Sequence, residues 1–254
     1  MQHEFAGKVV FVTGGSKGAG RGICERFLAH GATVVTCARS APEQALPGAV
    51  FRQLDILDFQ AVSEFFANFL RDFGRLDCLI NNVGGAPPAD AASASIRFSE
   101  KILALNLLAP IHLAQAAYQL MQRQADGGSI INIASVAALR PSPGVAVYGA
   151  AKAGLVHMTR SLAMEWAPRV RVNAIAAGLI HTEQAHLHYG DADGIAAVAR
   201  TIPMGRLATP ADIGEACLML ASPRSAYISG VCLPVDGGGE TLAWKNASSI
   251  YTPT

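Results

Sequence analysis

The chain has 254 residues, a length that α/β proteins reach as one domain, and 51% of its residues are apolar while only 15% are charged. This balance favours a well-buried sheet and apolar contacts between subunits. The net charge is +1 and no run of basic residues stands out, which argues against nucleic acid and an anionic membrane as partners. We therefore expect a small-molecule partner.

The cysteines and the first residues of the chain indicate its compartment. The cysteines lie in apolar surroundings without CxxC spacing, which is typical of small buried side chains rather than of disulfides or a zinc site; they are Cys24, Cys37, Cys78, Cys217 and Cys232. The opening MQHEFAGKVV lacks the basic start and apolar stretch of a signal peptide, and no apolar run approaches membrane-spanning length. These features predict a cytoplasmic protein.

Short β-branched runs alternate with longer amphipathic segments along the chain. In order, the pattern predicts a strand at 8–13, a helix at 20–30, a strand at 32–38, a loop at 39–48, a strand at 50–55, a helix at 58–73 and a strand at 76–82. There follow a long helix around 99–124, a strand at 128–135, a helix at 148–167, a strand at 170–176, a helix at 210–221 and a last strand near 231–236.

Apolar strands separated by helices predict a parallel sheet covered on both faces, which is a doubly wound, Rossmann-like fold with three layers, α/β/α. No internal repeat, low-complexity tract or linker marks a second part, so residues 1–254 are predicted to form a single domain. Residues 181–203, rich in His, Gly and Asp, are predicted to be irregular and to hold a substrate lid, and residues 240–254 form a C-terminal tail.

A glycine-rich stretch, TGGSKGAG at 13–20, directly follows the first predicted strand and opens the first predicted helix. Glycines there allow a tight turn and a close approach of a pyrophosphate, whose charge is favoured by the free N–H groups and positive end of the helix. The spacing is TGxxxGxG rather than GxGxxG, and a turn without a ligand is the alternative, because strand-to-helix turns need glycine anyway.

The five residues YGAAK, at 148–152, place Tyr148 and Lys152 one helical turn apart on the same helix face. One interpretation is a surface tyrosine above a lysine stem. The other is a phenol whose proton is made labile by the nearby ammonium. The pair alone does not decide between them.

Further motifs accompany these two in order. NNVG stands at 81–84, Asp55 follows the third predicted strand, Asn106 lies in the middle of a predicted helix, Ser135 closes IINIAS, and GRLATPADIG, YISG and PVDGGG come late. With them, nearly the whole chain resembles a short-chain dehydrogenase/reductase. It is most similar to the single-domain bacterial branch with 3-oxoacyl-acyl-carrier-protein reductases and alcohol, sugar and steroid dehydrogenases.

The resemblance implies an oxidoreductase that transfers a hydride between a nicotinamide cofactor and a secondary alcohol or ketone. Tyr148 is then the general acid/base, and Ser135 hydrogen-bonds the substrate oxygen. Lys152 bonds the nicotinamide ribose, and Asn106 holds a water that links Lys152 to solvent. A free phenol has a pKa near 10, so we expect Lys152 and the cationic nicotinamide ring to lower the pKa of Tyr148.

The resemblance also implies a set of cofactor-binding residues. The phosphates and the adenosine ribose fall to the turn residues Thr13, Gly14, Gly15, Ser16, Lys17, Gly18, Ala19 and Gly20. Asp55 and Ile56 are implied at the adenine, and Asn82 at the ribose region. Ile180 and Thr182 are implied at the nicotinamide amide and the pyrophosphate, and Tyr148 and Lys152 complete the set. As an alternative, Asp55 is an ordinary turn carboxylate.

The end of the second predicted strand predicts NADP(H) rather than NAD(H). In NAD-preferring relatives an acidic residue ends that strand, accepts hydrogen bonds from the ribose 2′-hydroxyl and repels a 2′-phosphate. Here Ala38 takes that place and Arg39 follows, while Lys17 comes from the glycine-rich turn. We expect Arg39 and Lys17 to flank the phosphate. The alternative is that both are solvated surface charges.

Two rival functions stay open. One is a 3-oxoacyl thioester reductase, although residues 181–203 offer only Arg200 as a basic group for a phosphopantetheine arm. The other is a catalytically silent cofactor-binding sensor or scaffold, against which the intact Ser135, Tyr148, Lys152 and Asn106 argue.

Assembly and metal binding complete the predictions. Apolar-rich helices around 99–124 and 148–166 build a four-helix subunit contact in relatives, so we expect a homotetramer, with a dimer next. The apolar side chains of the tail, namely Leu242, Trp244, Ile250 and Tyr251, predict that it packs across another subunit. His181, His186 and His188 lack metal-ligand spacing, and we expect no metal.

Overall fold

The computed structural model describes residues 4–242 together with 248 and 250. They form a seven-stranded sheet in the order β3-β2-β1-β4-β5-β6-β7, with every neighbouring pair parallel. The strands are β1 (Val9–Thr13), β2 (Thr33–Ala38), β3 (Ala49–Gln53), β4 (Cys78–Asn81), β5 (Gly128–Ser135), β6 (Val170–Ala177) and β7 (Cys232–Val235). The predicted doubly wound fold is confirmed.

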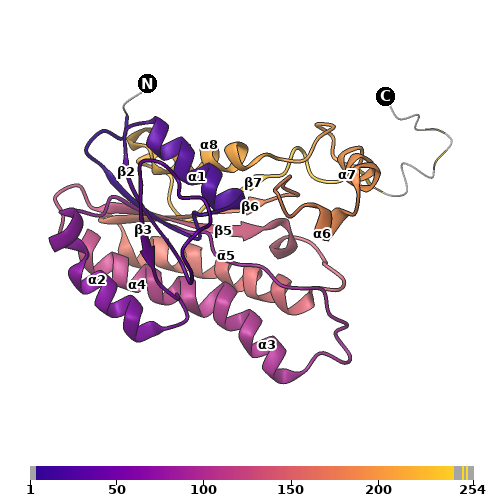
Figure 1. The fold of residues 1–254 in the computed structure, drawn as a ribbon, viewed down its shortest axis with the longest axis horizontal. Coiled ribbons are helices and arrows are strands. Elements are labelled where there is room, and N and C mark those ends of the chain that lie inside the picture. Colours follow the sequence, from indigo (N-terminus) through magenta and orange to yellow (C-terminus); the bar gives the residue numbers. More distant parts are fainter. Residues whose placement is uncertain (1–3, 243–247, 249, 251–254) are drawn as a thin grey trace.

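Helices cover both faces of the sheet (Figure 1). The α-helices are α1 (Gly18–Ala29), α2 (Phe59–Phe73), α3 (Ile96–Leu103), α4 (Ala109–Met121), α5 (Ala146–Trp166), α6 (His186–Tyr189), α7 (Ala192–Ala199) and α8 (Pro210–Ala221). Single turns of other helix types are η1 (Ala104–Leu108), η2 (Val136–Ala138) and η3 (Pro223–Ser225). Helices α2, α4 and α5 pack on one face and α1 and α8 on the other.

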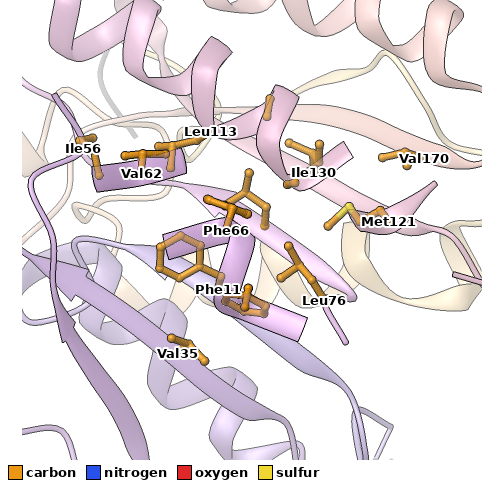
Figure 2. Close-up of a cluster of buried hydrophobic side chains, with 14 of the residues drawn as sticks. Phe11, Val35, Ile56, Val62, Phe66, Leu76, Leu113, Met121, Ile130 and Val170 are labelled. Atoms are coloured by element: carbon orange, nitrogen blue, oxygen red, sulfur yellow. The ribbon is translucent and has the colours of Figure 1, made fainter. Parts of the chain in front are cut away.

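Helix α2 is held on the sheet by an N-terminal cap and by one stripe of apolar side chains. Asp58 caps it by accepting a hydrogen bond from the N–H of Ala61 at 3.0 Å. Val62, Phe66 and Phe69 then recur on one side and are buried against Phe11 of β1 (Figure 2). Side chains at this spacing share a helix face, so one apolar stripe holds α2 on the sheet.

The long helix predicted around 99–124 is present as one unbroken helical stretch made of α3, η1 and α4, with bounds that differ by three residues at each end. Ser95 starts α3 earlier by accepting a hydrogen bond from the N–H of Phe98, the helix widens to a π-turn at η1, and α4 ends at Met121. Such π-turns are frequent at functional sites. Asn106 lies in this turn, in agreement with the locally opened helix that the family resemblance implies.

Residues 181–203 are less irregular than predicted, because they hold α6 and α7. Asp191 caps α7 by accepting a hydrogen bond from the N–H of Gly194 at 3.0 Å. Helices this short are not stable alone, so they depend on the surrounding fold and leave only a weak periodic signal. Of the apolar residues of the tail, Leu242 and Ile250 are exposed, while Trp244 and Tyr251 lie outside the described residues.

All five cysteines are free, as predicted. Cys24, Cys37, Cys78 and Cys217 are buried, and Cys232 is half-buried. Burial raises the pKa of Cys24, Cys37 and Cys78 to about 12, so these thiols are poor nucleophiles. No helix within residues 4–242 is long and apolar enough to cross a membrane.

Candidate active site

The motif residues gather at the carboxyl ends of the central strands. Thr13 ends β1, Asn81 ends β4 and Ser135 ends β5. The sheet order reverses between β1 and β4. In open α/β sheets, ligands bind at the carboxyl ends of the strands where the order reverses.

The glycine-rich turn after β1 has the geometry of a phosphate cradle. Gly14 and Gly18 have φ angles of 69° and 55°, which favour glycine. A Cβ on Gly20 would lie 2.1 Å from the carbonyl oxygen of Gly14, so only glycine lets α1 start this close to the turn. The N–H of Gly15 donates to Thr36 Oγ1 at 2.8 Å. Lys17, the residue before α1, makes no side-chain capping bond to the helix. The turn therefore fits the pyrophosphate of a dinucleotide.

Thr13 and Asn82 tie the ends of β1 and β4 together. Thr13 Oγ1 accepts hydrogen bonds from the N–H groups of Asn82 at 2.9 Å and Val83 at 3.1 Å. Asn82 Nδ2 donates to the carbonyl oxygen of Thr13 at 2.9 Å. Thr13 is buried, so its hydroxyl holds the ends of these two strands together rather than facing a ligand.

Of the two residues that the resemblance implies at the adenine, Asp55 is exposed and Ile56 is buried. Asp55 is exposed, and its Oδ1 accepts a hydrogen bond from the N–H of Leu57 at 3.0 Å, as in an ordinary turn. Ile56 is buried in the core cluster shown in Figure 2. Its side chain is therefore committed to the core, and only its backbone is available to a ligand.

Arg39 and Lys17 lie at the surface, one after β2 and the other in the glycine-rich turn after β1. Arg39 directly follows β2, and both side chains are exposed. Neither forms an ion pair with another residue in the described part of the chain. Both cations are therefore available to an anion.

Asn106 and Lys152 meet at the loop that follows β4. Asn106 is fully buried, accepts a hydrogen bond from the N–H of Gly85 at 2.8 Å, and donates to the carbonyl oxygens of Gly85 at 2.9 Å and Ile102 at 3.0 Å. A Cβ on Gly84 would lie 2.7 Å from Asn106 Oδ1 and 2.9 Å from Lys152 Nζ. The two side chains therefore flank Gly84 at close range.

Lys152 is almost fully buried, and its Nζ donates to the carbonyl oxygen of Ile133 at 2.8 Å. Burial lowers the pKa of Lys152 from 10.5 to about 8, because a low-dielectric environment disfavours the charged form. The Nζ atom lies 5.7 Å from the centre of the Tyr148 ring. The i, i+4 spacing in α5 thus does bring the two side chains together, with Lys152 buried and Tyr148 half-buried.

Tyr148 is hydrogen-bonded to Ser135, which links α5 to the end of β5. Burial raises the pKa of Tyr148, and the bond to Ser135 lowers it only in part. The lowering that we expect from Lys152 and an oxidised nicotinamide acts against this burial and stays a prediction for the cofactor-bound site. Ser135 Oγ also accepts a hydrogen bond from the N–H of Ala137 at 3.2 Å.

Ile180 and Thr182 follow β6, whose last residue Ala177 pairs with Ser135. Ile180 bridges to Ala208, and Thr182 Cγ2 lies 3.6 Å from the position of a Cβ on Gly18. The next residue, Glu183, accepts a hydrogen bond from the N–H of Gly18 at 2.9 Å. The segment after β6 therefore lies on the glycine-rich turn.

Sequence reasoning missed several residues near the site. Glu183 is one, and Tyr189 of α6 is another. Burial raises the pKa of Tyr189, which is hydrogen-bonded to the backbone of Ile180. Tyr148 lies near enough to raise the pKa of Tyr189 further. Arg140 and Glu240 form an ion pair at a cavity of about 150 Å³ beside η2. No local motif marks any of these four residues.

A cavity of about 470 Å³ lies at the amino ends of the strands, on the side opposite to the motif residues. The residues that line it include Lys8, Asp77, Ser129 and Arg171. Cavity size therefore does not identify the site, whereas the convergence of motif residues does. Among the described residues, no group of three or more His, Cys, Asp or Glu side chains is arranged to hold a metal ion.

Comparison with known proteins places the chain in a family. A family model described as Enoyl-(Acyl carrier protein) reductase matches residues 14–240. The chain is 35% identical over 249 residues to 3beta-hydroxysteroid dehydrogenase 1 of Eggerthella lenta, which covers 94% of this chain and 95% of that protein.

Solved structures agree with this placement. Ligand-free aldohexose dehydrogenase of Thermoplasma acidophilum matches with a TM-score of 0.88 and 30% identity over 99% of this chain and 98% of that one. ElxO with NADP bound matches with a TM-score of 0.84 and 28% identity over 91% of this chain and 98% of that one. The chain therefore belongs to the short-chain dehydrogenase/reductase family, whose members are nicotinamide-dependent oxidoreductases acting on CH–OH and C=O groups.

Proposed function

We propose that this protein transfers a hydride between NADP(H) and a secondary alcohol or ketone, with Tyr148 as the general acid/base. The observation that carries the proposal is the half-buried Tyr148, which is bonded to Ser135 and whose ring centre lies 5.7 Å from Lys152 Nζ, beside a cradle of glycines. When bound in that cradle, the nicotinamide supplies or accepts the hydride. The protein then has only to bind, orient and manage one proton.

Proton transfer follows from the state of Tyr148. With its pKa raised by burial, the phenol is protonated at neutral pH and is ready to donate to a carbonyl oxygen, which supports reduction. Ser135 holds the same oxygen by a hydrogen bond. Oxidation of an alcohol needs the phenolate instead, so its rate is expected to rise with pH. Lys152, whose pKa of about 8 keeps it mostly protonated at neutral pH, places a cation 5.7 Å from the centre of the Tyr148 ring, which favours the phenolate.

The assignment of Tyr148 is tested by Tyr148→Phe, which removes only the hydroxyl. Turnover of ketones with NADPH is expected to fall by about 10²- to 10⁴-fold, the range that general acid catalysis contributes, while the Kd for NADPH is unchanged. Tyr227→Phe is the matched control, because Tyr227 is fully exposed. Turnover near that of the unmodified protein in Tyr148→Phe would refute the assignment.

Preference for NADP(H) over NAD(H) is supported by the exposed, unpaired Arg39 and Lys17 and by Ala38 at the end of β2. The relative ElxO was solved with NADP bound. We expect kcat/KM with NADPH to exceed that with NADH by at least about tenfold. A double variant, Ala38→Asp with Arg39→Ala, is expected to reverse the order. Equal or better efficiency with NADH in the unmodified protein would overturn this preference and leave the Tyr148 mechanism intact.

A 3-oxoacyl thioester reductase is the second candidate, favoured by 34% identity over 254 residues to a 3-oxoacyl-acyl-carrier-protein reductase of Chlamydia muridarum. Against it, the only basic side chain within residues 181–203 is Arg200, and Arg140 at the nearby cavity is paired with Glu240. Parallel assays of 3-oxoacyl thioesters and free ketones with NADPH distinguish the two. Cofactor binding without turnover of any compound in a broad panel would instead support a catalytically silent sensor or scaffold.

A homotetramer, with a dimer next, is proposed for the assembly. Exposed apolar side chains support it: Leu108 and Met164 lie on η1 and α5, and Tyr227, Ile228 and Val231 lie between α8 and β7. Apolar groups of this size at the surface mark contacts between proteins. Light scattering at micromolar concentration tests the proposal, and a monomer would refute it.

Residues 181–203 are proposed as the substrate lid, and residues 240–254 as a tail that packs across another subunit. The ion pair of Glu240 with Arg140 supports a position of the tail's first residue beside the site. Deletion of residues 241–254 tests the tail. Unchanged assembly and activity after this deletion would refute its role.

A cytoplasmic location is proposed on the five free cysteines, since a reducing compartment keeps thiols unpaired. Fractionation of cells that make the protein tests the location. Recovery outside the cytoplasmic fraction would refute it.

A further inference from the structure

The contact between Glu183 and Gly18 joins two parts of the site that lie far apart in the sequence. Gly18 is the first residue of α1, and its N–H donates to Glu183 Oε1 at 2.9 Å. The residue before the helix, Lys17, makes no side-chain capping bond. Glu183 therefore acts as the acceptor that caps this helix, although it is 165 residues away.

The amide that Glu183 engages is one that favours a phosphate group. A free N–H in the first turn of a helix, at the positive end of its dipole, attracts anions. Gly18 has the positive φ and the open surroundings of a cradle, with only Thr182 atoms near the place of a Cβ. A phosphate oxygen and the Glu183 carboxylate cannot both take the same short bond, and their charges repel.

We infer that Glu183 sets the affinity for the dinucleotide by competing with the pyrophosphate for the amide of Gly18. Glu183 lies in the segment that follows the bridge between Ile180 and Ala208 and leads into α6. Release of its carboxylate therefore frees the start of residues 181–203 as the cofactor enters. The inference rests on the nicotinamide dependence of the family and on the turn as the pyrophosphate site, and is independent of the preference for NADP(H).

A simpler role for Glu183 makes a different prediction. If its carboxylate only pins the segment against the turn, its removal loosens residues 181–203 and leaves cofactor affinity the same or weaker. If it competes with the pyrophosphate, its removal tightens binding. The sign of the change in Kd therefore separates the two roles.

The experiment measures binding directly, with the full chain and without substrate. Titrations of NADPH and of NADH are compared for the unmodified protein, Glu183→Ala, Glu183→Gln and the control Gln184→Ala, whose position is adjacent and exposed. Glu183→Ala is expected to lower the Kd about tenfold for both nucleotides, because they share the pyrophosphate. Glu183→Gln keeps a hydrogen-bond acceptor but loses the charge, so its Kd is expected to lie between those of the unmodified protein and Glu183→Ala.

Two further features mark a competition between charges. The gain in Glu183→Ala is expected to shrink at high salt, since salt screens exposed charges, and Gln184→Ala is expected to leave the Kd unchanged. An unchanged or higher Kd in Glu183→Ala, an equal gain in Gln184→Ala, or a gain with only one nucleotide would overturn the inference. Because turnover is not measured, loss of the Tyr148 mechanism would leave this result unaffected.

Discussion

Two regions border the candidate active site, and they are held in different ways. On the sheet side, Asn106 and Lys152 are 0% and 2% exposed and are bonded to backbone groups of the core. On the lid side, Glu183 is exposed, and the helices α6 and α7 have four and eight residues. Buried, hydrogen-bonded side chains such as Asn106 and Lys152 move only when much of the protein unfolds, whereas an exposed segment with short helices opens locally. Proton handling thus depends on the rigid region, and cofactor entry on the loose one.

The largest expected effect on stability is in the apolar core between α2 and the sheet. Phe69→Ala should lower the free energy of unfolding by about 3–5 kcal/mol, because the ring is fully buried among Phe11, Phe66 and Phe73. Urea unfolding followed by circular dichroism measures it. Phe59→Ala is the control on the same helix, with a side chain 41% exposed, and should cost less than about 1 kcal/mol. Equal losses would show that burial of α2 does not anchor this region.

The next effect concerns the cost of burying Lys152. Since burial lowers its pKa from 10.5 to about 8, the unfolded state binds more protons between these values, and its contribution to stability rises with pH there. Relative to the unmodified protein, Lys152→Met should be most stabilised below pH 8, by on the order of 3 kcal/mol, and this advantage should vanish towards pH 10.5. Urea unfolding of both proteins from pH 7 to pH 10 checks it. A difference independent of pH would contradict the lowered pKa.

A smaller effect is expected on the lid side. Asp191→Ala removes the cap of α7, where Asp191 accepts from the N–H of Gly194, at a local cost of about 1 kcal/mol. Amide exchange should become faster at 192–199, while the urea midpoint of the whole protein stays the same. Asp193→Ala is the control, because Asp193 lies two residues further along, in the first turn of α7, and the cap is made by Asp191. A lower midpoint in Asp191→Ala would mean that the lid and the core unfold together.

The smallest effect on stability is expected at the ion pair of Arg140 and Glu240. The two side chains are 41% and 39% exposed, and pairs of this kind contribute less than about 1 kcal/mol. Because both residues line the cavity beside η2, Glu240→Gln should raise the KM for the substrate and leave kcat unchanged. Glu215→Gln, which breaks the pair with Arg26 elsewhere, should change neither. A fall in kcat without a change in KM would argue against a role in substrate binding.

Much of the fold was predictable, and the errors share a cause. The strands were predicted because each is a short apolar run, and the glycine-rich turn because its glycines meet local steric needs at Gly14, Gly18 and Gly20. The helices α6 and α7 were missed, since segments of four and eight residues depend on packing rather than on their own periodicity. The rise that burial causes in the pKa of Tyr148 was not foreseen, because burial is not visible in the spacing of YGAAK.

By itself, the sequence determined the alternation of strands and helices, the glycine turn and the pairing of Tyr148 with Lys152 on one helix face. Those features depend on periodicity and steric demands that act over a few residues. Only the tertiary structure decided that Glu183 caps Gly18 and that Glu240 meets Arg140, contacts that span 165 and 100 residues. The strand order brings the loops after β5, β6 and β7 to one edge of the sheet, and no local pattern specifies which side chains meet there.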